Sequence, residues 1–181
     1  KFKVVEFDES PKIAAHFTAS NRYEGFIEDI GPTAKLMLRL MGKTVVQSTS
    51  IVSTHIEAVQ HMMRMLEESS KREGPALSFD AVGHRVVHGG EQFREPVVID
   101  DAVMAAIEGL VELAPLHNPG SIAGIKGARS VIGSHIPMVA VFDTVFHRSI
   151  PTRASTYAID PDLASRHGIR RYGFHGIAHA S

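Results

Sequence analysis

The most constraining feature of this sequence is a short apolar run that follows a helical pattern. Residues 137–142, PMVAVF, contain no polar side chain, and residues 121–131 before them fit a helix. A wholly apolar run after a helix is typical of a strand that is buried on both faces of an α/β sheet. We therefore predict an α/β protein, with a mixed sheet flanked by helices, in which residues 137–142 form such a strand.

The N-terminal part of the chain has a different pattern. Residues 2–7 alternate apolar and polar side chains, residues 13–30 are of mixed polarity, and residues 44–51 are rich in β-forming residues. Loops are expected at residues 8–11 and 31–32, where turn-forming residues gather. This pattern predicts a sheet of short antiparallel strands.

The other elements are marked by spacing, caps and turns. Apolar residues recur at helical spacing over residues 53–70, after Ser53 or Thr54 as a possible N-cap, and residues 71–75 break that helix. In this chain the pair Gly89 and Gly90 is expected to end a strand, and Asp100 or Asp101 to begin a helix. A proline at residue 161 is expected to begin another helix. The resulting predictions are a strand over residues 77–87 with a turn at Gly89 and Gly90, a helix from Asp100 or Asp101 to about residue 113, a loop over residues 114–119, a helix over residues 161–167 and a strand over residues 169–172.

The charge balance and the absence of cysteine exclude several functions. The chain has 181 residues, with 19 lysines and arginines against 20 aspartates and glutamates, and no cysteine. Nucleic-acid binders usually carry excess positive charge, and without cysteine there is no disulfide, thiolate nucleophile or cysteine zinc site. No apolar run approaches the roughly 20 residues that span a bilayer. We therefore expect a cytoplasmic protein that binds neither nucleic acid nor membranes.

The first candidate site lies in residues 83–93, GHRVVHGGEQF. In a strand, Arg85 and Val87 share one face, while His84, Val86 and His88 share the other. An arginine at an apolar strand end is costly unless its guanidinium meets a carboxylate or a phosphate. A ligand and a structural ion pair both satisfy this requirement, so both interpretations stay open.

Two further candidates follow along the chain. Prolines on both sides fix the loop that presents His117, which acts either at a site or as a structural hydrogen-bond donor. Asp143 comes directly after the apolar strand, at the end where open α/β sheets place their ligands. Its carboxylate either holds Mg²⁺ or orients a nucleophile, or it caps the next segment.

The fourth candidate is residues 168–181, GIRRYGFHGIAHAS. If a helix begins near Gly176, His175 lies at its N-terminal end, where anions are favoured and an imidazole can donate to a phosphoryl oxygen. His175 and His179 lie four residues apart, as do His84 and His88, but neither pair has an HExxH glutamate or an evident third ligand. We therefore expect no zinc site.

Together these segments place an arginine, two histidines and an aspartate at strand or helix ends beside glycine or proline. Such groups converge on an anion. Phosphoryl transfer needs charged and hydrogen-bonding groups of this kind, because its catalysis is mostly positioning and charge stabilisation. A carboxylate-binding module would use the same groups.

Four segments in this order resemble the acetate kinase family: HRVVHGG at 84–90, APLHNP at 114–119, VFDTVFH at 141–147 and HGIRRYGFHG at 167–176. The resemblance implies the acetate and sugar kinase, Hsp70 and actin superfamily, in which two ribonuclease-H-like domains close on ATP and substrate. Residues 1–148 would be the first domain, without its first strand and phosphate loop, and residues 149–181 the opening of the second. The implied reaction transfers the γ-phosphoryl group of ATP, with Mg²⁺, to acetate, reversibly and in a homodimer.

The resemblance also implies the catalytic residues. Arg85 would bind the carboxylate and the phosphoryl group in transfer, and Asp143 would support Mg²⁺ and Arg85. His175 would donate to the phosphoryl group, and His117 would line the site.

The remaining implied residues bind substrate and nucleotide. Val87, Leu116 and Phe174 would form the small pocket for the acetate methyl group. Lys1 resembles the lysine that ends the phosphate loop. Propionate or butyrate kinase, a non-catalytic carboxylate- or nucleotide-binding module, and a histidine-rich metal-binding protein are the alternatives.

The resemblance covers less than half of a family subunit, so we predict that these 181 residues alone do not make acetyl phosphate. In the family, a second active-site arginine and the glutamate that ligates Mg²⁺ lie beyond the matched part. A hydroxamate assay on this chain, with ATP, Mg²⁺ and acetate, checks the prediction. Clear formation of acetyl hydroxamate would contradict it.

Overall fold

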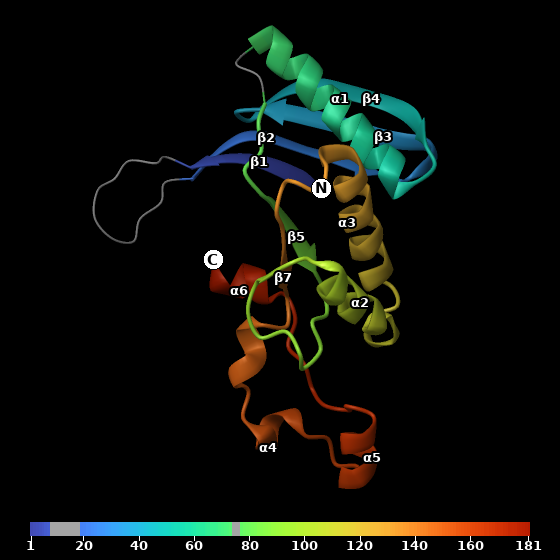
Figure 1. The fold of residues 1–181 in the computed structure, drawn as a ribbon, viewed down its shortest axis with the longest axis vertical. Coiled ribbons are helices and arrows are strands. Elements are labelled where there is room, and N and C mark those ends of the chain that lie inside the picture. The colour runs from blue at the N-terminus through green and yellow to red at the C-terminus, as the bar shows by residue number, and fades with distance from the viewer. Residues whose placement is uncertain (8–18, 74–76) are drawn as a thin grey trace, which may run out of the picture. The chain divides into compact units, whose positions relative to one another are not determined.

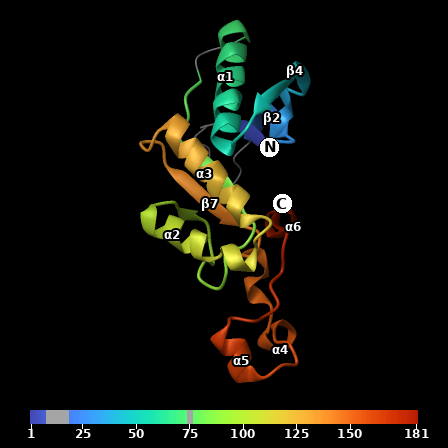
Figure 2. The same ribbon diagram turned by 90° about the vertical axis from the view of Figure 1, so that its right-hand side faces the viewer.

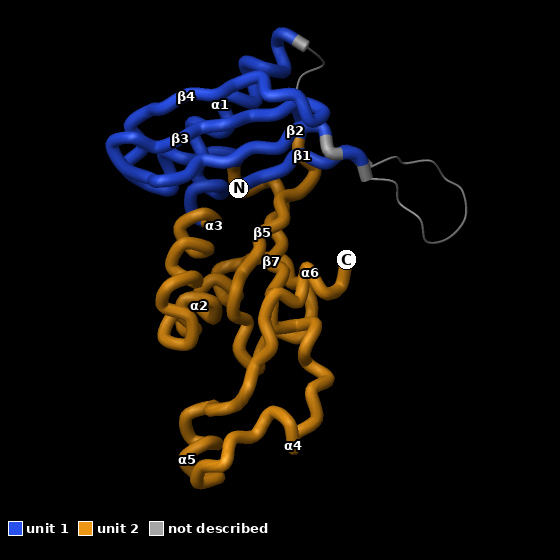
Figure 3. Tube along the Cα trace, turned by 180° about the vertical axis from the view of Figure 1, so that it is seen from behind, with its two compact units in different colours: residues 1–78, 126–132 blue, residues 79–125, 133–181 orange. Residues whose placement is uncertain are grey.

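The computed structural model describes residues 1–7, 19–73 and 77–181. The chain divides into two compact units, one of residues 1–78 with 126–132 and one of residues 79–125 with 133–181 (Figure 3). Sheets and helices occur in both units, and the predicted α/β class with a mixed sheet is confirmed. In the described ranges, no helix combines the length and the apolar character that a membrane span requires.

The first unit contains a four-stranded antiparallel sheet in the order β1-β2-β3-β4. Its strands are β1 (Phe2–Phe7), β2 (Ala19–Glu28), β3 (Gly31–Leu40) and β4 (Lys43–Val52). The predicted antiparallel sheet is confirmed, but three of its strands have 10 residues and are not short.

The loop predicted at residues 31–32 is wrong, because these residues begin β3. The chain reverses earlier, at Asp29, whose φ is 56°. Pro32 lies where the pairing of β3 with β4 is irregular, so its missing N–H interrupts no regular ladder. The other predicted loop, at residues 8–11, lies outside the described residues.

Helix α1 (His55–Glu73) lies along one face of this sheet (Figure 1). The Thr54 hydroxyl accepts a hydrogen bond from Glu57 N at 3.1 Å, and the Glu57 carboxylate accepts one from Ser53 N at 2.6 Å. This reciprocal capping confirms the predicted start. The helix continues to Glu73, past the break predicted at residue 71. Leu66 on the helix and Leu38 on β3 are both buried, and α1 contacts β2 and β4, so a core lies between helix and sheet.

The second unit contains a three-stranded mixed sheet in the order β5-β7-β6. Its strands are β5 (Val82–Val86), β6 (Val97–Val98) and β7 (Met138–Phe142). β7 is central, parallel to β5 and antiparallel to β6. The predicted apolar strand is confirmed, but burial alternates along it, so only one face is fully covered within this unit. β5 is shorter than the predicted 77–87.

Helices connect these strands. The helix predicted from Asp100 or Asp101 to about residue 113 is α2 (Asp101–Gly109), which ends earlier and is followed by the 3-10 helix η1 (Val111–Leu113). Helix α3 (Asn118–Ile132) begins earlier than predicted and includes the end of the expected loop. It contributes residues 118–125 to the second unit and 126–132 to the first.

Four short helices follow β7, and α4 and α5 lie away from the sheet of the same unit (Figures 1 and 2). They are η2 (Phe146–Ser149), α4 (Thr152–Ser155), α5 (Pro161–Arg166), as predicted, and α6 (Gly176–Ala180). The strand predicted over residues 169–172 is wrong. Ile169 N bonds to Ala164 O at 2.8 Å and Arg171 N to Ser155 O at 2.7 Å. Because these amides bond to helix ends, the segment joins no sheet in residues 77–181.

The cap of α2 gives a stability prediction. Asp100 accepts a hydrogen bond from Val103 N at 2.7 Å, so Asp100→Ala should lower the free energy of unfolding by about 1 kcal/mol. Asp100→Asn keeps the accepting oxygen and should stay close to the wild type in the same urea titration. An equal loss in both variants would rule out the cap as the cause.

Candidate active site

The candidate site is built at the carboxyl ends of two parallel strands, β5 and β7. Arg85 pairs with Val141 and Val86 with Phe142, and Asp143 N then donates to Val86 O at 3.1 Å. Parallel pairing brings the two strand ends to the same sheet edge. Residues 58 positions apart in the sequence therefore meet as a direct consequence of register.

At this edge Arg85 and Asp143 form a forked ion pair. Arg85 Nε donates to Asp143 Oδ1 at 3.1 Å and Oδ2 at 3.0 Å, and Nη2 donates to Oδ2 at 2.5 Å. The Asp143 side chain is 1% exposed and that of Arg85 is 55% exposed. Hydrogen bonding to Asp143 raises the pKa of the Arg85 guanidinium, which stays charged. The carboxylate thus orients a cation whose other edge reaches solvent.

The ion pair bears on both interpretations of Arg85 that the sequence left open. A structural ion pair does exist, and it still leaves part of the guanidinium free for a ligand. The alternative in which Asp143 caps the next segment is wrong. The cap residue of η2 is Val145, which forms no side-chain cap.

Asn118, which sequence reasoning did not single out, attaches a second chain segment to this edge. It is fully buried, its Oδ1 accepts from His88 N at 3.2 Å, and its Nδ2 donates to His88 O at 3.2 Å. The loop that carries Leu116 and His117 is thereby held against the end of β5. An asparagine before Pro119 at a helix start was the available signal, but it does not reveal the partner.

His88 itself supports the aromatic part of the site. It is 2% exposed, and its Nδ1 accepts from Gly90 N at 2.9 Å. Burial lowers the pKa of His88, so the ring is neutral and carries its proton on Nε2. Its ring meets Tyr172 edge-on at a centroid distance of 4.5 Å and Phe174 at 5.5 Å. Phe174 is therefore held near the end of β5.

A third segment reaches the site through a close backbone approach. Gly176 N donates to Asp143 O at 2.9 Å, and a Cβ on Gly176 would collide with that oxygen. Only glycine allows this approach. His175 precedes it as the N-cap residue of α6, with φ 56°, which confirms the predicted helix start. His147 Nε2 lies 2.9 Å from Phe174 O and fixes the same segment.

The structure thus brings together most of the residues selected from sequence. Arg85 and Asp143 bond directly, and short contacts anchor the segments of Leu116, His117, Phe174 and His175 to the same edge. Val87 directly follows β5 and is partly exposed. Within residues 77–181, His117 and His175 form no side-chain hydrogen bond to the ion pair. Lys1 belongs to the other unit, where its ammonium lies 3.3 Å from Glu24 Oε1, and its role stays a prediction.

The acidic side chain at this edge is engaged by Arg85 and has no cluster of metal ligands around it in the described residues. No three histidine, aspartate or glutamate side chains of residues 1–7, 19–73 and 77–181 gather in a group that could hold an ion. Both oxygens of Asp143 accept from Arg85. Direct Mg²⁺ ligation by this buried carboxylate therefore does not fit the arrangement.

Comparison with known proteins identifies the family of this chain. The model of the Acetokinase family matches residues 1–181. The chain belongs to the acetokinase family. An acetate kinase of Solibacter usitatus is 47% identical over 157 residues, which are 85% of this chain and 38% of that protein.

Solved structures of the acetokinase family share the fold. The crystal structure of the acetate kinase from Porphyromonas gingivalis superposes with a TM-score of 0.79 at 36% identity and covers 88% of this chain and 40% of its own. A propionate kinase from Francisella tularensis gives 0.78 at 34% identity, with the same coverage. The chain therefore spans about two fifths of the length of these relatives.

The Asn118 contact gives a pH-dependent prediction. Asn118→Asp replaces the donor to His88 O by a carboxylate oxygen, which should cost about 2 kcal/mol of unfolding free energy at neutral pH. Burial beside a carbonyl raises the pKa of the new carboxyl in the folded state. The deficit relative to wild type should therefore be full above that pKa and shrink as the pH falls, because the protonated carboxyl donates again.

Denaturant titrations between neutral and acidic pH measure this deficit. The exposed amide Gln47 offers a matched control, since Gln47→Glu adds the same charge in solvent. A deficit that is independent of pH, or equal in both variants, would contradict the role of Asn118.

Proposed function

We propose that the complete protein transfers the γ-phosphoryl group of ATP to a short-chain carboxylate, acetate first, and forms an acyl phosphate and ADP reversibly. The observation that carries this proposal is the forked ion pair at the strand ends. It presents a permanently charged, half-exposed guanidinium whose direction is set by a buried carboxylate. The family and the propionate kinase neighbour support a carboxylate as acceptor.

Arg85 is assigned to reduce the electrostatic repulsion between the two reactants. A carboxylate oxygen must form a bond to the γ-phosphorus while the bond from phosphorus to the bridging oxygen of ADP breaks. Both reactants are anions that repel each other. A guanidinium between them lowers that repulsion most when charge spreads over the transferring group. Asp143 is a positioning residue here, because its oxygens are committed to Arg85.

The histidines and Lys1 complete the assignment. His175 donates to the transferring phosphoryl group from the N-cap of α6, and His117 lines the site from the loop that Asn118 anchors. Lys1 binds nucleotide phosphates. Mg²⁺ bound together with ATP would neutralise part of the phosphate charge.

The acyl group of the substrate is assigned to an apolar pocket made of Val87, Leu116 and Phe174. Leu116 is 89% exposed and Phe174 41% exposed, so apolar surface is available beside the guanidinium. An apolar wall separates substrates that differ by one methylene only weakly, by roughly 10- to 200-fold. Acetate is therefore the first choice, and propionate and butyrate are the competing acceptors.

The wider assignments rest on the family. We assign residues 1–148 to the first domain and residues 149–181 to the opening of the second. The complete protein is proposed to act as a cytoplasmic homodimer.

The decisive variants separate the cation from its positioning carboxylate. In the complete gene product that carries this sequence, Arg85→Ala should abolish measurable turnover, and Asp143→Asn should lower kcat by about 10²-fold because the guanidinium loses its orientation. Arg153→Gln on α4 changes a charge away from the strand ends and should leave turnover unchanged.

These rates are measured by acetyl hydroxamate formation, with circular dichroism to verify folding. Asp143→Asn with folded protein and kcat within about twofold of wild type would overturn the positioning role. Binding of acetate and Mg-ATP by calorimetry without any turnover would instead identify a non-catalytic binding module.

Specificity is tested separately with acetate, propionate and butyrate as acceptors. We expect kcat/KM to be highest for acetate. A higher value for propionate would reassign the substrate while leaving the role of Arg85 intact.

A further inference from the structure

A second group of cationic side chains surrounds a pocket in the second unit. The pocket is formed by the turn after β5, the residues after β7 and the segment before α6. It is lined mainly by Glu91, Arg94, Arg148, Arg170, Arg171 and Tyr172. Four arginines against one glutamate give it a net charge of +3 when its histidine is neutral.

The single acid does not satisfy these arginines. Glu91 binds Arg170 at 2.6 Å. Arg148 uses one nitrogen to reach the carbonyl of Arg94 at 2.6 Å, and Arg171 reaches Ala154 O at 3.1 Å. In the described part of the chain, the Arg94 guanidinium has no carboxylate partner, and Arg170 Nε is buried without an acceptor. Donors and positive charge are therefore both in excess.

We propose that this pocket binds a phosphate dianion, either inorganic phosphate or a phosphate group of a nucleotide. Planar guanidinium forks match the oxygens of such an anion. The charge of −2 offsets most of the excess that Glu91 leaves. This site differs from the proposed acyl-group site, since none of its lining residues belongs to that set.

Two neutral groups extend the donor set. Thr144 lines the pocket, and its Oγ1 accepts from Gly89 N at 3.2 Å, so its hydroxyl hydrogen remains to be donated. Burial, and then the charge of Glu91, raise the pKa of Tyr172, which keeps its phenol protonated and able to donate. Both groups suit an oxyanion better than a cation or an apolar ligand.

The test is a calorimetric titration of the 181-residue chain with inorganic phosphate, with ionic strength held constant by chloride. We expect saturable binding of one phosphate. Arg94→Gln should weaken it about tenfold, which corresponds to about 1.4 kcal/mol. Glu91→Gln should strengthen it about threefold, because it removes the competing carboxylate from Arg170.

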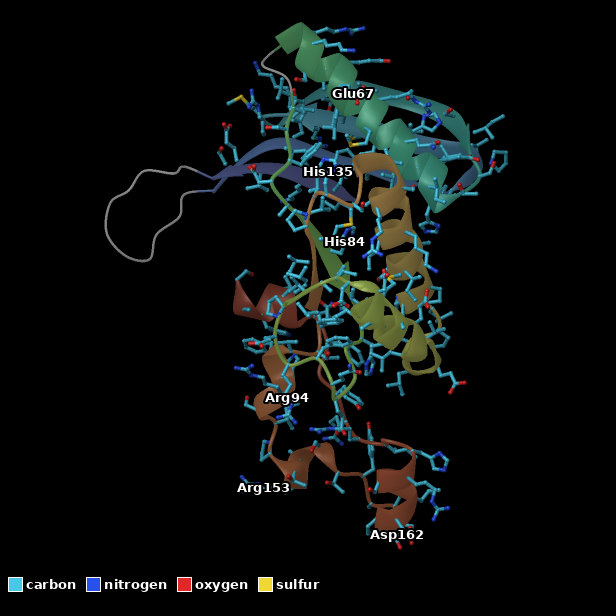
Figure 4. The ribbon with its side chains drawn as sticks, viewed as in Figure 1. Glu67, His84, Arg94, His135, Arg153 and Asp162 are labelled. Carbon is cyan, nitrogen blue, oxygen red and sulfur yellow. The ribbon has the colours of Figure 1, made fainter. Side chains whose placement is uncertain are left out.

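A matched control comes from Arg153, which lies on α4 and does not line the pocket (Figure 4). Arg153→Gln should change the affinity by less than about twofold. The readout here is phosphate binding and not turnover, so a failure of the proposed kinase site stays distinguishable from a failure of this one. Thermal melts verify that each variant is folded.

The two anion sources are separated by competition with ADP. Displacement of phosphate by ADP that depends on Arg94 assigns the pocket to a nucleotide phosphate, and the absence of displacement assigns it to the free anion. The proposal is overturned by non-saturable binding, by equal losses in Arg94→Gln and Arg153→Gln, or by weaker binding in folded Glu91→Gln.

Discussion

The site depends on the ion pair between Arg85 and Asp143. Burying a carboxylate that is 1% exposed costs free energy unless a cation and hydrogen bonds replace water. Arg85 supplies three donor contacts from the neighbouring strand, and it can do so only in the register that sets Arg85 opposite Val141. The pairing of the two strands, the burial of Asp143 and the orientation of the Arg85 guanidinium therefore depend on one another.

Other chain segments are fixed to this edge by polar contacts that replace regular secondary structure. The amide of Asn118 satisfies both backbone groups of His88, and Gly176 N satisfies the carbonyl of Asp143. Each contact pairs a buried backbone group that would otherwise cost free energy. The segments of His117 and His175 consequently approach the ion pair without belonging to the sheet.

The features that local patterns encode were predictable, and those that depend on partners were not. Features that depend only on neighbouring residues include the apolar run before Asp143, the caps Thr54 and Asp100, and the helix start at Gly176. The bond of Asn118 to His88 spans 30 positions and leaves no local pattern. Residues 169–172 look like a strand, but their amides bond to helix ends, so local β-propensity was overridden.

The two arginine sites differ in how their charge is held, and this difference predicts different ligand behaviour. Arg85 faces a buried acid that cannot leave, so its charge is directed outward whether or not a ligand is bound. Arg170 shares Glu91, whose side chain is 54% exposed, and an arriving anion must compete with that carboxylate. Such competition, screened by solvent, favours modest affinity and ready exchange. The Arg85–Asp143 pair is therefore suited to a reaction that needs a fixed guanidinium, whereas the arginine pocket is suited to reversible anion binding.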